Sequence, residues 1–215
     1  TLGVIITAAL TGMFCYFVLG FELYEGLLVG AVLSSTDAAS VFSVLRSKKL
    51  SLKYGTSSML ELESGSNDPV AYLLTMIGIM MKTGGSLSSL PYMIFAQVVF
   101  GLAIGAAAAS LGILLLKKGT MQAAGMDMIL VTALVMIAFG LSEAIGGNAF
   151  LTVYLMGILL GNSNIRGKET LIPFFDGMTG LAQIVLFFLL GLLSFPHKLP
   201  QIFFVSLAIA IVLTV

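Results

Sequence analysis

The feature that most constrains this chain of 215 residues is a succession of long apolar segments joined by short polar connections. The segments cover about 1–20, 21–46, 54–82, 91–117, 125–145, 148–162, 171–195 and 199–215. A helix needs roughly 20 mostly apolar residues to span the hydrocarbon core of a bilayer. The sequence therefore predicts an all-α polytopic membrane protein with about eight transmembrane helices, in one domain over 1–215.

The composition excludes other classes of protein. Hydrophobic residues make up 59% of the chain and charged residues only 9%, whereas soluble domains are about a quarter charged. The zero net charge indicates no nucleic-acid partner. We find no Gly-rich phosphate loop, metal-ligand cluster or nucleophile elbow. The sequence therefore predicts neither an enzyme nor a cofactor.

The positive charges predict an orientation in the membrane. Eight of the ten Lys and Arg residues fall in three alternate loops, 46–53, 117–124 and 162–170. Loops rich in Lys and Arg stay on the cytoplasmic side, so these three loops are expected to be cytoplasmic. Both chain ends lie inside apolar segments, so we expect an internal piece of a longer protein.

A first polar cluster interrupts the second apolar segment. The run over 34–40 contains Ser34, Ser35, Thr36 and Asp37, and such side chains compete with the backbone for hydrogen bonds and weaken a helix. The run predicts an interrupted helix, and transporters place ion sites at such breaks. Asp37 could neutralise the positive N-terminal end of the following half-helix. The alternative is a continuous helix with a tightly packed face of small residues.

A second polar cluster lies in the third segment. Ser64 and Asp68 are four residues apart and share a helix face, with Glu63 and Asn67 on the adjacent face. Pro69 removes a helical hydrogen bond, which frees a carbonyl oxygen nearby. An oxygen-rich patch around one carboxylate suits Na⁺ or K⁺. The alternative is a structural polar network or an interfacial stretch.

One carboxylate at membrane depth suggests a transport chemistry. A proton or a cation can neutralise it, but not both, and this competition allows exchange if the site opens alternately to each side. Two other functions remain open. A cation channel needs a pore-lining filter, which we do not find. An intramembrane aspartyl protease would use Asp37 and Asp68, but its Gly-x-Gly-Asp signature is absent.

The two clusters resemble motifs of the cation:proton antiporter superfamily, in its NhaP-type and sodium/hydrogen-exchanger branch. Thr36-Asp37-Ala38 resembles the Thr-Asp-Pro motif of a broken helix, and 63–68 resembles the Glu-Ser-x-x-Asn-Asp motif of the next helix. Ala38 departs from the usual proline, so the position of the break is less defined. The form that this motif takes around Thr36, Ser-Thr-Asp-Ala-Ala-Ser-Val-Phe, is most similar to that of bacterial NhaP-type potassium/proton antiporters.

The resemblance implies a fold and an assembly. The family has about thirteen spans with inverted repeats and forms homodimers, and this chain would run from the fourth span to the eleventh. Residues 1–82 would form the core ion-site helices, and residues 91–215 the remaining scaffold, dimer-side and linking helices. The expected location is the bacterial inner membrane.

The resemblance also implies a role for each motif residue. Asp68 would alternate between a proton and a monovalent cation, with Asn67 in support, and Ser64 and Thr36 would complete the cation site. Asp37 would balance the broken helix. An Asn-Asp pair is typical of the electroneutral branch, so one-for-one exchange of K⁺ or Na⁺ for H⁺ is expected.

Five further polar residues have structural interpretations. The resemblance implies that Glu63 pairs with an arginine of a later helix, outside this chain. We expect Glu143 and Asn148 to cap a helix or lie at a helix interface. Asp127 and Asp176 are predicted to mark the starts of two helices on the cytoplasmic side.

Overall fold

The structure is a computed structural model, and it describes residues 2–36, 56–118, 125–165 and 167–214. Within these ranges the chain is helical and contains no strand. The helices are α1 (Leu2–Phe17), α2 (Leu23–Leu33), α4 (Thr56–Lys82), α5 (Leu90–Lys118), α6 (Met126–Ala144), α7 (Ala149–Asn162), α8 (Lys168–Leu193) and α9 (Leu199–Thr214), with short 3-10 turns η1 (Leu87–Ser89) and η2 (Pro196–Lys198). Each predicted apolar segment thus contains one described helix.

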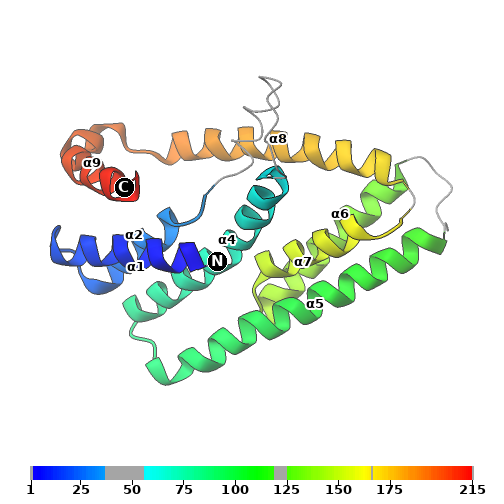
Figure 1. The fold of residues 1–215 in the computed structure, drawn as a ribbon, viewed down its shortest axis with the longest axis horizontal. Helices are drawn as coiled ribbons and strands as arrows, with labels where there is room; N and C mark the ends of the chain where they lie inside the picture. The colour runs from blue at the N-terminus through cyan, green and yellow to red at the C-terminus, as the bar shows by residue number, and fades with distance from the viewer. Residues whose placement is uncertain (1, 37–55, 119–124, 166, 215) are drawn as a thin grey trace.

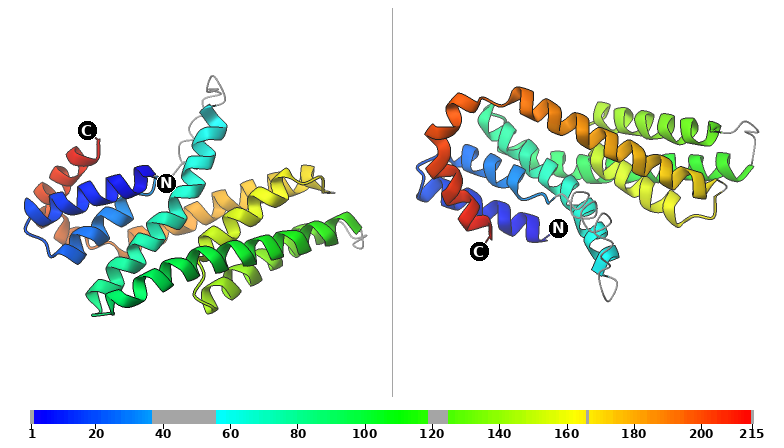
Figure 2. Two further views of the ribbon diagram at one scale, coloured as in Figure 1. Left: turned by 60° about the horizontal axis from the view of Figure 1, so that its bottom comes forward. Right: turned by 90° about the horizontal axis from the view of Figure 1, so that it is seen from above.

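The helices form two packed groups with α4 between them (Figure 1). The first group pairs α1 with α2, and α4 packs against this pair. The second group consists of α5, α6 and α7, and α4 contacts α7 from the other side. Figure 2 shows α8 running across both groups, from its contact with α6 to α9, which returns to α1. This arrangement makes α4 the element that both groups share.

Glycines bring α1 and α2 into backbone contact. A Cβ atom added at Gly26 would lie 2.6 Å from the carbonyl oxygen of Gly12, and one at Gly30 would overlap the carbonyl oxygen of Ala8. Small residues at such crossings allow close helix packing inside a membrane. The contact continues to the last turn of α2, which therefore has a fixed position relative to α1.

The second group has its own apolar core between α5, α6, α7 and the start of α8. Its buried residues are Ala109, Leu116, Val131, Leu134, Ala138, Met156, Leu160 and Leu171. Beyond Leu171, most side chains of α8 are exposed, including a run of Leu, Val, Ile and Phe residues. Such a surface is incompatible with water and suits a lipid environment or further protein.

Among the described residues, four stretches are long and apolar enough to cross a membrane: Leu90–Lys118, Met126–Ala144, Lys168–Leu193 and Pro196–Thr214. The helices Leu2–Phe17, Leu23–Leu33 and Ala149–Asn162 are apolar but shorter. At 1.5 Å per residue, helices of this length fall short of the roughly 30 Å hydrocarbon core. The prediction of an all-α membrane protein is confirmed, and the predicted count of eight spans is not.

Candidate cation site

The described part of α2 ends at the hydroxyl run, as the sequence predicts. The helix stops at Leu33, and Ser34 forms its C-cap with a backbone N–H that donates to the Gly30 carbonyl. The Ser34 hydroxyl turns back and donates to the Ala31 carbonyl over 2.8 Å. This local bond satisfies a carbonyl that a continuing helix would use, so the chain leaves the helical path here. Asp37 and the predicted second half-helix lie outside the described residues.

The middle of α4 meets this helix end. Ser35 donates from its hydroxyl to Oδ1 of Asp68 over 2.5 Å. Ser64 donates from its hydroxyl to the backbone carbonyl of Thr36 over 2.8 Å. Asn67 donates from Nδ2 to the Thr36 hydroxyl over 3.1 Å. Two polar clusters that are about 30 residues apart in sequence therefore form one hydrogen-bonded group.

Burial differs within this group, which we call the hydroxyl–carboxylate cluster (Ser35, Thr36, Ser64, Asn67 and Asp68). Asn67 is only 2% exposed, Ser35 and Ser64 are half-buried, and Thr36 and Asp68 are exposed. The Oδ1 atom of Asn67 is buried without a hydrogen-bond partner among the described residues. A buried carbonyl oxygen without a partner is costly, so this atom needs a donor or a cation.

The cluster offers oxygen ligands of three kinds: a carboxylate, hydroxyls, and amide or backbone carbonyls. Hard cations prefer such ligands. In the described ranges no three His, Cys, Asp or Glu residues gather into a group that could hold a metal ion. One acidic side chain surrounded by neutral oxygens fits a singly charged ion better than a multivalent one, since each carboxylate balances one positive charge.

Sequence reasoning placed most of this cluster and missed one member. The structure brings the predicted residues Thr36, Ser64, Asn67 and Asp68 together. Ser35 was part of the hydroxyl run but was not named as a site residue, because helical spacing gives no register beyond a helix end. Glu63 lies on α4 and is exposed, and its backbone carbonyl accepts from the Ser66 hydroxyl over 2.8 Å.

The other predicted polar residues take structural positions. Asn148 caps α7, with its side-chain oxygen accepting from the Leu151 backbone N–H. Glu143 accepts a hydrogen bond from the Tyr72 hydroxyl over 2.9 Å, which links α6 to α4. Asp127 lies in the first turn of α6 as predicted. The prediction for Asp176 was wrong, because α8 begins at Lys168 and extends through Asp176 without interruption.

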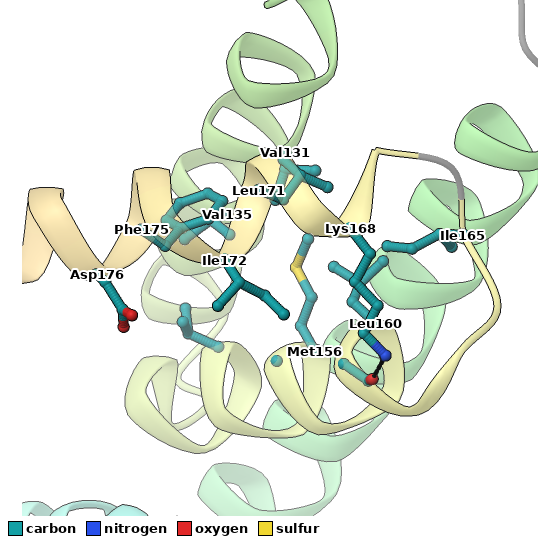
Figure 3. Close-up of a pocket in the computed structure, with 13 residues that line it drawn as sticks. Val131, Val135, Met156, Leu160, Ile165, Lys168, Leu171, Ile172, Phe175 and Asp176 are labelled. Carbon is teal, nitrogen blue, oxygen red and sulfur yellow. Dashed lines mark hydrogen bonds between the residues drawn. The ribbon is translucent and has the colours of Figure 1, made fainter.

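A separate cavity of about 390 Å³ lies between α6, α7 and α8 (Figure 3). Its wall is apolar, with Met156, Ile172 and Phe175 among its residues. Lys168 is at its edge and donates to the backbone carbonyl of Gly161. This lining is apolar apart from the charged residues Lys168 and Asp176, and it shares no residue with the hydroxyl–carboxylate cluster, so we do not assign the cation to this cavity.

A family model described as "Sodium/hydrogen exchanger, transmembrane" matches residues 1–215. The chain belongs to the sodium/hydrogen exchanger family. This family consists of transporters, so the chain is an integral membrane protein of a transporter family and not an enzyme. The resemblance that the motifs indicated is confirmed.

Curated relatives of this exchanger chain cover almost all of it. The K(+)/H(+) antiporter NhaP of Alkalimonas amylolytica is 37% identical over 215 residues, which are 99% of this chain and 37% of that protein. The K(+)/H(+) antiporter NhaP2 of Shewanella oneidensis is 39% identical over 214 residues, which are 98% of this chain and 37% of that protein.

An archaeal protein is more distant. The probable Na(+)/H(+) antiporter 2 of Methanocaldococcus jannaschii is 28% identical over 178 residues, which are 77% of this chain and 42% of that protein. The exchanger chain thus spans a little over a third of the length of its first bacterial relatives. No solved structure gave a significant match.

Proposed function

We propose that the full-length protein is a secondary antiporter that exchanges K⁺ or Na⁺ for H⁺ by alternating access. The membership in the exchanger family supports antiport, and the relatives named as K(+)/H(+) antiporters favour potassium. The structural observation behind the mechanism is Asp68, whose carboxylate accepts from Ser35 at the end of α2. Asp68 takes a proton or a cation in turn.

Neutral oxygens around Asp68 complete the proposed cation site. Thr36 provides a carbonyl and a hydroxyl, Ser64 provides a hydroxyl, and Asn67 provides the Oδ1 atom that has no partner among the described residues. The cation would satisfy this oxygen at the same time as it neutralises the carboxylate. When a proton takes its place, the cation ligands remain but the charge that holds the cation is gone.

The remaining roles follow from the family motifs. Asp37 balances the helix break, and Glu63 pairs with an arginine beyond this chain. We further propose that exchange is electroneutral, because the cluster contains one carboxylate and so releases one proton for each cation bound. The protein would act as a homodimer in the bacterial inner membrane, with loops 46–53, 117–124 and 162–170 in the cytoplasm.

The test is Asp68→Asn in the full-length protein. The variant keeps the size of the side chain and the acceptor for Ser35, but it cannot exchange a proton. We expect cation-dependent dissipation of a pH gradient in inverted vesicles to be lost with K⁺, Na⁺ and Li⁺, while the amount of inserted protein is unchanged. The control is Asp127→Asn, which removes a carboxylate from the first turn of α6, away from the cluster.

Three results separate the possibilities. Exchange that persists in Asp68→Asn contradicts the proposed role of this residue. Loss of exchange in Asp127→Asn to the same degree indicates a general effect of losing a carboxylate. Cation flux in the wild type without stoichiometric proton counter-movement indicates a channel. The order of rates among the three ions identifies the preferred substrate.

A further inference from the structure

The helix that holds Asp68 also has a face that packs against α7. The hydroxyl of Tyr154 donates to the Leu62 carbonyl over 3.1 Å, and the ring of Tyr154 lies against Gly65, where a Cβ atom would overlap it. The side-chain Nδ2 of Asn148 donates to the Pro69 carbonyl over 2.8 Å. These α4 positions recur at spacings of three and four residues, so they form one stripe along the helix.

The stripe and the hydroxyl–carboxylate cluster lie on different sides of α4. Ser64 and Asp68 contact the end of α2, whereas Gly65 and Pro69, one position later in each case, contact α7. Successive residues on an α-helix are about 100° apart. A shift or rotation of α4 against α7 would therefore displace the Asp68 carboxylate relative to α2.

Asn148 is the most constrained residue of this contact. It is 2% exposed, and its Oδ1 accepts from the Leu151 backbone N–H over 3.0 Å, which caps α7. Its backbone N–H donates to the Gln97 carbonyl over 3.0 Å, and its Nδ2 also lies 3.4 Å from Oε1 of Gln97. Capping requires only the side-chain oxygen, so the amide N–H bond to Pro69 is a separate function of the same side chain.

Asn148 is held by a buried hydrogen-bonded network between α5, α6 and α7. Thr152, one turn later, donates from its hydroxyl to the Gly101 carbonyl over 3.0 Å and lies 2.8 Å from the Ser142 hydroxyl. Thr152 and Ser142 are fully buried. At Gly101 a Cβ atom would lie 2.9 Å from the Asn148 carbonyl oxygen, so α5 and α7 are in backbone contact. A fully bonded buried network of this kind has one preferred arrangement.

We propose that Asn148 is a positioning residue for ion binding. Its side-chain amide fixes the Pro69 carbonyl, and thereby holds the adjacent Asp68 in line with the end of α2. This inference rests on the proposed function of Asp68. It predicts that loss of the amide N–H weakens cation binding, although Asn148 contacts a different side of α4 and is not among the proposed ligands.

The decisive variant is Asn148→Ser in the full-length protein. Serine caps helices as well as asparagine does, but its hydroxyl is too short to replace the amide at Pro69. We expect the cation concentration for half-maximal exchange to rise about fivefold, the change expected from one lost hydrogen bond. The maximal rate at saturating cation should change less. Asn148→Asp, which keeps the size and the capping oxygen but lacks the N–H donor, should act in the same direction.

The matched control is Asn162→Ser, at the other end of α7. Nδ2 of Asn162 also donates to a carbonyl, that of Ile158, over 2.8 Å, but within its own helix. We expect this control to keep the wild-type half-saturating cation concentration.

Every outcome decides the proposal. An unchanged half-saturating concentration in Asn148→Ser overturns it, as does an equal rise in Asn162→Ser. Failure of both Asn148 variants to insert assigns the residue to folding and also overturns it. A wild type without exchange refutes the proposed function itself, and that result is obtained without any Asn148 variant.

Discussion

The Ser35 hydroxyl donates to the Asp68 carboxylate over 2.5 Å and joins the residues that follow α2 to the middle of α4. Ser35 is half-buried and Asp68 is exposed, so water competes with this bond. Even so, it is a direct contact between the carboxylate and the residues that follow α2. The Ser35 hydroxyl is therefore expected to orient the Asp68 carboxylate.

We expect Ser35→Ala to weaken cation binding. The substitution removes a donor that orients the carboxylate, and the half-saturating cation concentration should rise by about threefold, less than for a fully buried bond. The assay is cation-dependent dissipation of a pH gradient at several cation concentrations. Ser66→Ala is the control, because Ser66 donates to the Glu63 carbonyl of its own helix. Equal behaviour of the two variants would contradict the role of Ser35.

Asn67→Leu should separate stability from transport. The leucine removes a buried Oδ1 atom without a partner among the described residues, which relieves a cost of about 1–3 kcal/mol. It also removes the hydrogen bond to Thr36, worth about 1 kcal/mol. We therefore expect an unchanged or higher melting temperature in detergent, but exchange about tenfold weaker at low cation concentration. A strongly lowered melting temperature with normal exchange would show that Asn67 has only a structural role.

Gly65→Ala should loosen α4 from α7. The added methyl group would overlap the ring of Tyr154, and overpacking of this kind costs about 1–3 kcal/mol. The melting temperature of the full-length protein in detergent should fall. Gly157→Ala is the matched control, since nothing lies within 4 Å of its Cβ position, and alanine is favoured in helices by about 1 kcal/mol. If Gly65→Ala melts like Gly157→Ala, the described contact does not bear on stability.

The sequence predicts these helices well because the residues that determine each helix are close together in the chain. Apolar runs locate each helix, and the competition of Ser34 with the backbone locates the end of α2. The hydroxyl run and the 63–68 motif also identify most of the cluster. In each case the residues that decide the structure lie within a few positions of one another.

The sequence did not predict which helices contact one another when they are far apart in the chain. Asn148 was expected to cap a helix or lie at an interface, but its partner Pro69 is 79 residues away. Periodicity shows which residues share a face of one helix and not which helix that face meets. The interpretation of Asp176 failed for a related reason. An acidic residue can stabilise a helix start, but it also occurs inside a long helix, and the sequence alone did not distinguish the two.

The backbone contact between α1 and α2 limits how the proposed antiporter could change shape. Gly26 lies against the Gly12 carbonyl and Gly30 against the Ala8 carbonyl. At these two crossings no side chain separates the backbones of α1 and α2. Sliding one along the other would bring these carbonyl oxygens against residues that carry a Cβ atom, for which the present spacing leaves no room. A conformational change that turns Asp68 from one side of the bilayer to the other must therefore move α1 and the end of α2 as a single rigid body.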